Sequence, residues 1–314
     1  MYKITVLLFL LSKLIFANST YSVGVINNRG FNNAIEKWQP TIDFLNVNIK
    51  NTTFELKPLS IKKLHEALSN KKLHFVLSNP GFFYDEQKSG LEPLTSLINK
   101  KRGKPYDQFG AVVFTTKDRT DINSYEDVKG QRFVAASKLG FGAFQMAWRE
   151  FLEQNIDPFS DFKSIDFIGF PQDSVVLAVK SKKYDVGTVR TDIFERMEDA
   201  GVINSKDFKV ISPKNLQNFP FMLSTRLYPD WVFSKTSKSS ESIATKVKQT
   251  LLQIDENSTM AKSGKYVGWT DEKRLYELFN MDMNNLLKIN TEDKYEGIDA
   301  LMKKLKIGPY KIVK

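Results

Sequence analysis

The chain has 314 residues, of which 41% are hydrophobic, so it is long enough for two domains with substantial cores and is not a disordered protein. Its formal charge of +10 comes from dispersed lysines and arginines without a dense basic block, which excludes a typical nucleic-acid-binding pattern but would attract anions. The absence of cysteine excludes disulfides, a thiol nucleophile and a cysteine metal site.

The N-terminus resembles a secretory signal. Lys3 precedes an apolar run, and Ala17 is followed by the polar Asn18, so residues 1–17 are expected to be a signal peptide cleaved after Ala17. Lys13 interrupts the apolar run and leaves it too short to span a bilayer well. An uncleaved anchor remains an alternative.

The first 80 residues of the mature chain alternate between strand and helix patterns. Apolar residues recur at helical spacing after the first strand, and Ser60 is placed to cap the second helix. This order favours an α/β sheet with binding loops at the carboxyl ends of its strands. The expected elements are a strand at 22–27, a helix at 31–45, a strand at 53–60, a helix at 60–72 and a strand at 73–78.

A second α/β unit is expected over residues 115–220. It begins with a long strand at 109–118 and is followed by a strand that returns at 219–227. The last third of the chain reads as mostly helical. Its expected helices cover 239–254, 271–282 and 295–307.

One α/β unit inserted in another is the plan of a hinged protein with two lobes. The first lobe would comprise residues 18–112 and 222–314, and the second residues 113–221. Two extended crossings, near 109–116 and 219–226, would join the lobes and allow them to close on a ligand in the cleft between them.

Seven segments carry a resemblance to a known family. In chain order they are NRGFNNAIEKWQPTIDFL, FVLSNPGFF, FGAVVFTTKDRTDINSYEDVKGQRFVAAS, FGAFQMAWREF, DVGTVRTDIFERM, FPFMLSTRLYPDW and GWT. Together they resemble the phosphonate-binding-protein-like family of periplasmic solute receptors, above all the sensor domain of tetrathionate-type sensor histidine kinases. The resemblance implies a type II periplasmic binding fold that closes on an anion. The kinases continue beyond the GPY segment, so this chain looks like a free-standing version.

The match to the phosphonate receptors themselves has three departures. Their Ser-Thr-Ser cluster, which holds phosphonate oxygens, corresponds to Leu139, Gly140 and Phe141. Their tyrosine after a Gly-Pro turn corresponds to Phe83, and their His-Asp pair corresponds to Gln172 and Asp173. The resemblance therefore implies the binding architecture but leaves phosphonate itself open as the ligand.

Two regions of the second lobe are expected to bind an anion. Gly140 and Gly142 precede a helix, whose free N–H groups would attract an anion, and Phe141 between them is expected to face the cleft. A purely structural turn explains these glycines equally well. Arg190 ends a strand and offers a planar fork of donors, with Thr188 and Thr191 as neutral donors beside it. The alternative for Arg190 is an ion pair with Asp192 or Glu195.

The first lobe would supply the opposite side of the site. Arg29 and Gly30 follow the first strand, and Asn79 and Pro80 follow the third. Arg29 is expected to face Arg190 across the cleft, so that a bridging anion would favour the closed state.

Catalysis and metal binding are not expected. His65 and His74 are the only histidines and lack further ligands at metal-site spacing, and no Ser/His/Asp set is present. The sequence thus predicts a monomeric periplasmic receptor without cofactor, which captures a small anion for a membrane sensor histidine kinase or an ABC permease. An enzyme on the same fold, with Asp173 as its base, and a structural envelope protein are the alternatives.

Overall fold

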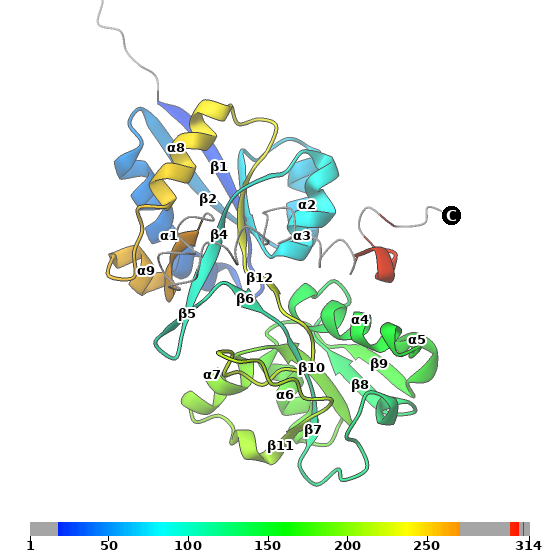
Figure 1. The fold of residues 1–314 in the computed structure, drawn as a ribbon. Coiled ribbons are helices and arrows are strands. Elements are labelled where there is room, and N and C mark those ends of the chain that lie inside the picture. Colours follow the sequence, from blue (N-terminus) through cyan, green and yellow to red (C-terminus); the bar gives the residue numbers. More distant parts are fainter. Residues whose placement is uncertain (1–17, 271–301, 308–309, 311–314) are drawn as a thin grey trace, which may run out of the picture.

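The computed structural model describes residues 18–270, 302–307 and 310. They form two α/β lobes, one above the other in Figure 1. Lobe 1 is built on a seven-stranded sheet and lobe 2 on a five-stranded sheet. A short ribbon of β6 (Gln108–Phe109) and β12 (Tyr228–Pro229) lies between the lobes. The expected helix at 271–282 lies outside the described residues.

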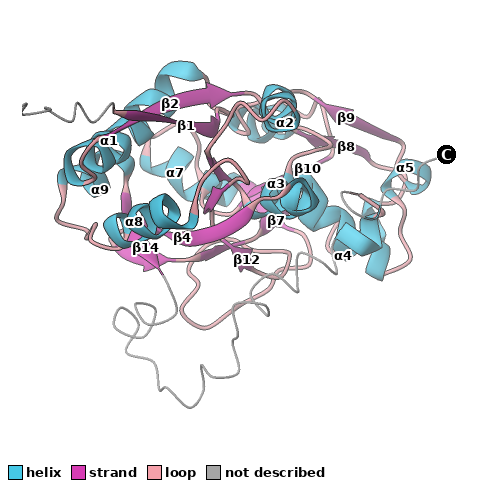
Figure 2. Cartoon of the chain, turned by 90° about the horizontal axis from the view of Figure 1, so that it is seen from above, coloured by secondary structure: helices cyan, strands magenta, loops and turns pink. Residues whose placement is uncertain are grey.

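Lobe 1 has strand order β14-β4-β13-β3-β1-β2, with β5 beside β4. Its strands are β1 (Ser19–Ile26), β2 (Thr52–Leu59), β3 (Phe75–Ser78), β4 (Glu92–Lys101), β5 (Lys104–Tyr106), β13 (Val232–Lys235) and β14 (Tyr266–Thr270). Its helical segments are α1 (Phe31–Asn48), α2 (Ile61–Ser69), α3 (Pro80–Glu86), η1 (Gln87–Ser89), α8 (Glu241–Leu251) and α9 (Thr259–Gly264). Strand β1 runs parallel to β2 and β3. Strand β13 pairs antiparallel with β3 and β4, and β14 pairs antiparallel with β4. Helices α1, α8 and α9 cover one face of this sheet, and α2 and α3 cover the other (Figure 2).

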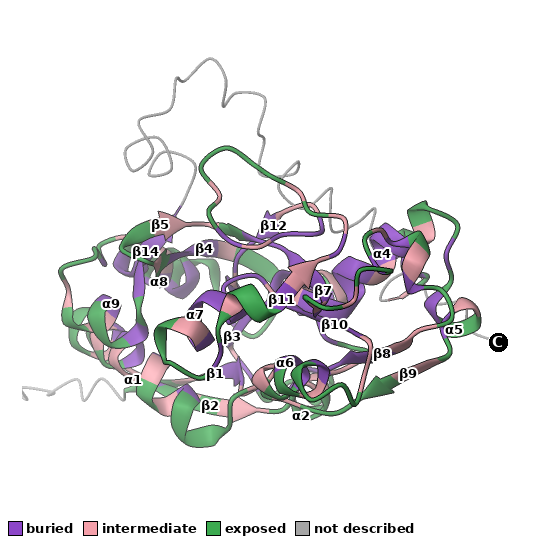
Figure 3. Cartoon of the chain, turned by 90° about the horizontal axis from the view of Figure 1, so that it is seen from below, coloured by how far each residue is buried: buried purple, intermediate pink, exposed green. Residues whose placement is uncertain are grey.

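Lobe 2 has strand order β11-β7-β10-β8-β9. Its strands are β7 (Ala111–Thr116), β8 (Arg132–Ala135), β9 (Ser164–Phe167), β10 (Val186–Arg190) and β11 (Phe208–Val210). Its helical segments are η2 (Glu126–Val128), η3 (Phe141–Gln145), α4 (Met146–Glu153), α5 (Pro158–Asp161), α6 (Asp173–Lys180), α7 (Ile193–Asp199) and η4 (Ser205–Asp207). In both lobes the central strands are largely buried, whereas the edge strands β2 and β9 and the outer turns are mostly intermediate or exposed (Figure 3).

The helices begin where the sequence favours them. Ala34, Trp38, Ile42 and Leu45 form the buried stripe of α1, as the helical spacing predicts. The Ser60 hydroxyl accepts a hydrogen bond from the N–H of Lys63 and so caps α2. None of the described helices combines the length and the apolar character that crossing a membrane requires.

Four strands of lobe 1, β4, β5, β13 and β14, were not expected from the sequence. Strand β4 lies between β13 and β14, and all three have runs of buried residues. The last third of the chain is therefore not mostly helical in its described part. Polar residues such as Thr95, Ser96 and Asn99 are buried in β4 and conceal its pattern.

The expected strand at 219–227 is absent. Its place is taken by an irregular segment whose side chains bind the backbone of β7. The hydroxyls of Ser224 and Thr225 accept hydrogen bonds from the N–H groups of Val113 and Ala111, each at 2.9 Å. Because these hydroxyls take the backbone donors, no regular ladder forms there.

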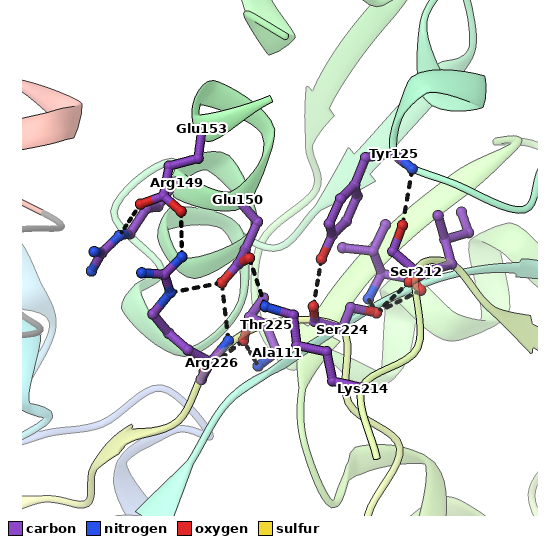
Figure 4. A network of polar contacts seen from close by, with 12 residues as sticks. Ala111, Tyr125, Arg149, Glu150, Glu153, Ser212, Lys214, Ser224, Thr225 and Arg226 are labelled. Atoms are coloured by element: carbon purple, nitrogen blue, oxygen red, sulfur yellow. Dashed lines mark hydrogen bonds and ion pairs between the residues drawn. The ribbon is translucent and has the colours of Figure 1, made fainter. Parts of the chain in front are cut away.

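A group of charged residues fastens this second crossing to lobe 2 (Figure 4). Glu150 of α4 accepts hydrogen bonds from the backbone N and the Nε of Arg226, both at 3.0 Å, and from the Nζ of Lys214 at 2.8 Å. Glu153 pairs with Arg226 and with the Nε of Arg149 at 2.8 Å. We call these five residues the hinge network.

The first crossing passes close to the second at Gly110. A Cβ atom at this position would lie 2.5 Å from Cδ1 of Leu223 and 3.0 Å from the carbonyl oxygen of Arg226. Only glycine allows this approach, which separates β6 from β7 and interrupts the single strand expected at 109–118. The expected boundary after residue 112 thus falls inside β7.

The described C-terminal segment packs at the same place. Met302 and Leu305 form an apolar cluster with Phe109, Phe141 and Tyr228. These partners belong to the ribbon and to lobe 2, although the sequence assigned residues 222–314 to lobe 1. The segment therefore contacts both crossings.

Candidate anion-binding cleft

A cavity of about 220 Å³ lies between the lobes. Lobe 1 contributes the loop after β1, one face of α1, the end of β4 and the residues after β12. Lobe 2 contributes the residues around η3 and the starts of α6 and α7. The polar and charged lining residues are Asn27, Asn28, Arg29, Asn33, Lys37, Asn79, Asn99, Lys101, Gln172, Arg190, Asp192, Arg196 and Asp230.

Four helices begin at this cavity. Their N-cap residues Gly30, Asn79, Gln172 and Asp192 all line it. No side chain caps the first turn of α1, α6 or α7. Because the N-terminal turn of a helix carries partial positive charge and unpaired N–H groups, these starts favour an anion in the cavity.

The charges of the lining are also predominantly positive. Five basic side chains line the cavity, against the two carboxylates of Asp192 and Asp230. They are Arg29, Lys37, Lys101, Arg190 and Arg196. A concave site with one dominant sign of charge concentrates ligands of the opposite sign.

Arg190 ends β10 and points across the boundary between the lobes. Its Nη2 lies 2.9 Å from Oδ2 of Asp230, and its guanidinium lies 4.1 Å from the centre of the Phe109 ring. The Nε has no hydrogen-bond partner, and the nearest carboxylate, that of Asp192, is 3.9 Å away. Arg190 is thus held in place with a donor still unused.

Asp230 is the carboxylate that holds Arg190. Its side chain is only 1% exposed, and it also accepts hydrogen bonds from Nδ2 of Asn99 at 2.5 Å and from the N–H of Trp231 at 2.7 Å. These donors compensate for the burial of the charge. The Arg190–Asp230 pair links lobe 2 to lobe 1.

Two further ion pairs cross the cleft. Arg29 lies 2.8 Å from Asp173, which also accepts a hydrogen bond from Arg196 at 2.6 Å, and Lys101 lies 2.5 Å from Asp192. Burial alone would raise the pKa of Asp173 and of Asp192, but the neighbouring cations outweigh it and lower both. Both carboxylates are therefore held in their charged form.

Lys37 is the cation of the lining that has no carboxylate partner among the described residues. Its Nζ lies 4.6 Å from the centre of the Trp38 ring. Desolvation in the cavity lowers the pKa of Lys37 to about 7, and the positive charge of Lys101 adds to this effect.

Eight of the thirteen residues predicted to bind a ligand line the cavity. They are Arg29, Gly30, Asn79, Gly140, Phe141, Gly142, Gln172 and Arg190. Arg29 and Arg190 lie on opposite lobes, as expected. Phe141 lines the cavity but is buried, and a Cβ atom on Gly81 would meet its ring at 2.3 Å. Phe141 is thus also a packing contact between the lobes.

The other five predicted residues do not line this cavity. Phe83 is fully buried in the apolar cluster behind α3, and Pro80 is the first residue of that helix. Thr188 is buried inside β10, and the Thr191 hydroxyl accepts a hydrogen bond from the N–H of Gly110 at 3.2 Å. Asp173 acts on the cavity only through Arg29 and Arg196, and it makes no helix cap.

The sequence did not indicate several residues of the lining. Asn99 and Lys101 lie on the unexpected strand β4, and Asp230 follows β12. Lys37 could have been recognised, because it lies three residues after Ala34, at the edge of the buried stripe of α1, and is itself partly buried. A partly buried lysine beside an apolar stripe is a signal for a function.

No cluster of three or more His, Cys, Asp or Glu side chains that could hold a metal ion occurs among the residues that the structure describes. His65 instead pairs with Glu86, and Nδ1 of His74 lies 3.1 Å from the backbone N of Ser22.

Comparison with known proteins agrees with this architecture. A family model described as the periplasmic substrate-binding protein of a phosphonate ABC transporter matches residues 23–281. The tetrathionate sensor histidine kinase TtrS of Salmonella typhimurium is 29% identical over 234 residues, which are 74% of this chain and 39% of that protein. The chain thus spans less than half the length of this curated relative.

Solved structures show the same fold. PhnD1 from Prochlorococcus marinus in complex with methylphosphonate has a TM-score of 0.66 and 14% identity, over 92% of this chain and 98% of that one. A binding protein component of an ABC phosphonate transporter from Pseudomonas aeruginosa has a TM-score of 0.61 and 16% identity, over 92% and 96% of the two chains. The fold is the type II periplasmic binding fold, as expected, and the chain belongs to the phosphonate-type family of periplasmic substrate-binding proteins.

Proposed function

We propose that this protein is a periplasmic receptor that captures a small anion in the cleft and presents it to a membrane partner. The observation that carries the proposal is the lining of the cavity, where five basic side chains and the uncapped starts of α1 and α6 surround about 220 Å³. The residues that line the cavity come from both lobes, so an anion bound between them would stabilise the closed arrangement of the lobes.

The ligand class is a small oxidised anion. Oxidised sulfur anions are the first candidates, because the relative TtrS is a tetrathionate sensor. Phosphonates come next, since PhnD1 was solved with methylphosphonate, and carboxylates complete the set. The absence of hydroxyls at Leu139, Gly140 and Phe141 weighs against a phosphonate bound as the sequence resemblance would place it.

The test is a screen of the exported protein for ligand-dependent stability. An anion present at about 100 times its Kd should add about 2.7 kcal/mol to the free energy of unfolding. Tetrathionate, methylphosphonate and a dicarboxylate are the probes, and titration calorimetry follows any rise in melting temperature. If no anion stabilises the protein at millimolar concentration, the proposed receptor function is wrong.

The membrane partner is a sensor histidine kinase or an ABC permease, as in the relatives. Export itself is tested by the mass of the protein from the periplasm, which should begin at Asn18. Intact protein beginning at Met1 in the cytoplasm would contradict the proposed location.

A further inference from the structure

Lys37 occupies an unusual position within the cleft. It lies at the edge of the buried stripe of α1, is partly exposed, and lines the cavity. The charged groups that act on it come from four segments of the two lobes: Lys101 from β4, Arg190 from β10, Asp192 from the start of α7 and Asp230 from the loop before β13. Two of these four neighbours are cations.

The two nearby carboxylates are already engaged. Asp230 holds Arg190 and Asn99, and Asp192 lies 2.5 Å from Lys101. Neither lies within ion-pair distance of Lys37 in the described chain. An anionic ligand would therefore be the first counter-ion that Lys37 meets.

We propose that Lys37 makes the affinity of the cleft depend on the charge of the ligand, because its amine takes up a proton from solvent when an anion enters the cleft. The inference rests on the proposed function as an anion receptor. The balance is simple: a neutral amine and a ligand of charge −n become an ammonium and a bound ligand of charge −n, at the expense of one solvent proton. A ligand with more negative charge gains more from this step than a monoanion does.

The direction of the pH dependence follows. Desolvation in the cavity lowers the pKa of Lys37 to about 7, so in the free protein the neutral amine becomes available as the pH rises above neutrality. A bound anion favours the ammonium and raises the pKa of Lys37. Affinity should therefore be constant below about pH 6 and should fall by up to about tenfold for each pH unit above pH 7, until the raised pKa is passed.

Titration calorimetry with tetrathionate tests the proposal. Tetrathionate remains a dianion between pH 6 and 9, so a proton taken up on binding must go to the protein. At pH 8, in two buffers with different heats of ionisation, the wild-type protein should take up about one proton per ligand. The proton count of the wild type is informative whether or not any variant folds.

Three variants assign the proton. Lys37→Met should bind more weakly and take up no proton, and Lys37→Arg should keep affinity that no longer depends on pH, because a guanidinium stays charged. The control Lys62→Met removes an exposed lysine from α2 and should behave as the wild type does.

The possible results are distinct. Binding with proton uptake that disappears in both Lys37 variants supports the proposal. Binding without proton uptake, or with uptake that persists in Lys37→Met, overturns it and leaves the receptor function intact. If tetrathionate does not bind, another anion from the screen is used with its own ionisation subtracted. Failure of every anion to bind overturns the receptor function and this inference together.

Discussion

The cleft and the hinge network both contain ion pairs between arginine and carboxylate side chains, but these pairs connect different parts of the molecule. In the cleft, Arg190 of lobe 2 pairs with Asp230, and Arg29 of lobe 1 pairs with Asp173 of lobe 2. In the hinge network, Glu150 and Glu153 of α4 bind Arg226 of the second crossing (Figure 4). The cleft pairs link one lobe to the other, whereas the hinge network fastens a crossing to a single lobe.

This difference indicates which contacts can exchange with a ligand. Opening of the lobes would separate the cleft pairs and leave their cations free for an anion. Opening would not separate Glu150 from Arg226, because Ser224 and Thr225 also bind the crossing to β7. We therefore expect the bending to occur at the β6–β12 ribbon, near 107–110 and 227–230, and not over 219–226 as the sequence suggested.

The largest effect is expected from Glu150→Gln, which breaks the hinge network. Glu150 is buried, and its loss leaves Arg226 and Lys214 without their shared carboxylate, so the free energy of unfolding should fall by about 3 kcal/mol. Affinity for the anion should stay unchanged, since Glu150 lies outside the cavity lining. Denaturant unfolding and calorimetry on the same variant measure both quantities.

The pH dependence of this variant provides an internal check. Burial alone would raise the pKa of Glu150, but the hydrogen bonds from Arg226 and Lys214 outweigh it and lower the pKa below its usual value. The contribution of Glu150 is therefore present above the pKa of the unfolded chain and is lost as the pH falls through the lowered pKa. The stability difference between wild type and Glu150→Gln should shrink in acid. A difference that is constant down to pH 3 would contradict the network.

An intermediate effect is expected from Arg190→Gln, on affinity and stability together. The loss of a charged donor in the cleft should weaken anion binding by about 30-fold, or about 2 kcal/mol. The variant should also unfold more easily, because Asp230 stays buried with only neutral donors. Arg190→Lys should restore part of the affinity, since a point charge cannot replace the planar fork.

The matched control for Arg190 is Arg119→Gln. Arg119 is also an arginine of lobe 2 with two carboxylate partners, Asp121 and Asp185, but it does not line the cavity. Its loss should leave anion affinity unchanged. Equal loss of affinity in the two variants would show that Arg190 acts only through the general charge of the protein.

The sequence predicted those features of the cleft and of the two lobes that depend on local residue patterns. The strand–helix alternation gave two lobes, and the residues at strand ends gave Arg29 and Arg190 as facing cations. Asp230 could not be predicted, because its partners Arg190 and Asn99 are distant in the chain and a buried charge is understood only with its partners. Strand β4 was missed because its buried residues Thr95, Ser96 and Asn99 are polar.

The placement of Phe83 shows the limit of a resemblance. The family position suggested a ligand contact, but a phenylalanine there can pack into the apolar cluster behind α3, where a tyrosine hydroxyl would need a partner. The hinge network shows a different limit. Arg226 and Glu150 are 76 residues apart, so no local pattern relates them.

The smallest effect is expected from Arg29→Gln at the mouth of the cleft. Arg29 is 42% exposed and its partner Asp173 24%, so loss of their ion pair should change the free energy of unfolding by less than about 1 kcal/mol. Its consequence for binding depends on the role of the pair. If Arg29 contacts the anion, Arg29→Gln should weaken binding a few-fold, and Asp173→Asn, which frees Arg29 and Arg196, should strengthen it.

If the pair only latches the lobes, both substitutions should weaken binding by similar amounts, since each removes the same link between lobe 1 and lobe 2. The double variant separates the two roles further, because for a simple latch the second substitution adds nothing to the first. Calorimetry on the three variants, with small-angle scattering to follow compaction on binding, measures these differences. Opposite changes in affinity place Arg29 among the ligand contacts, and equal losses make the Arg29–Asp173 pair a latch that the ligand does not touch.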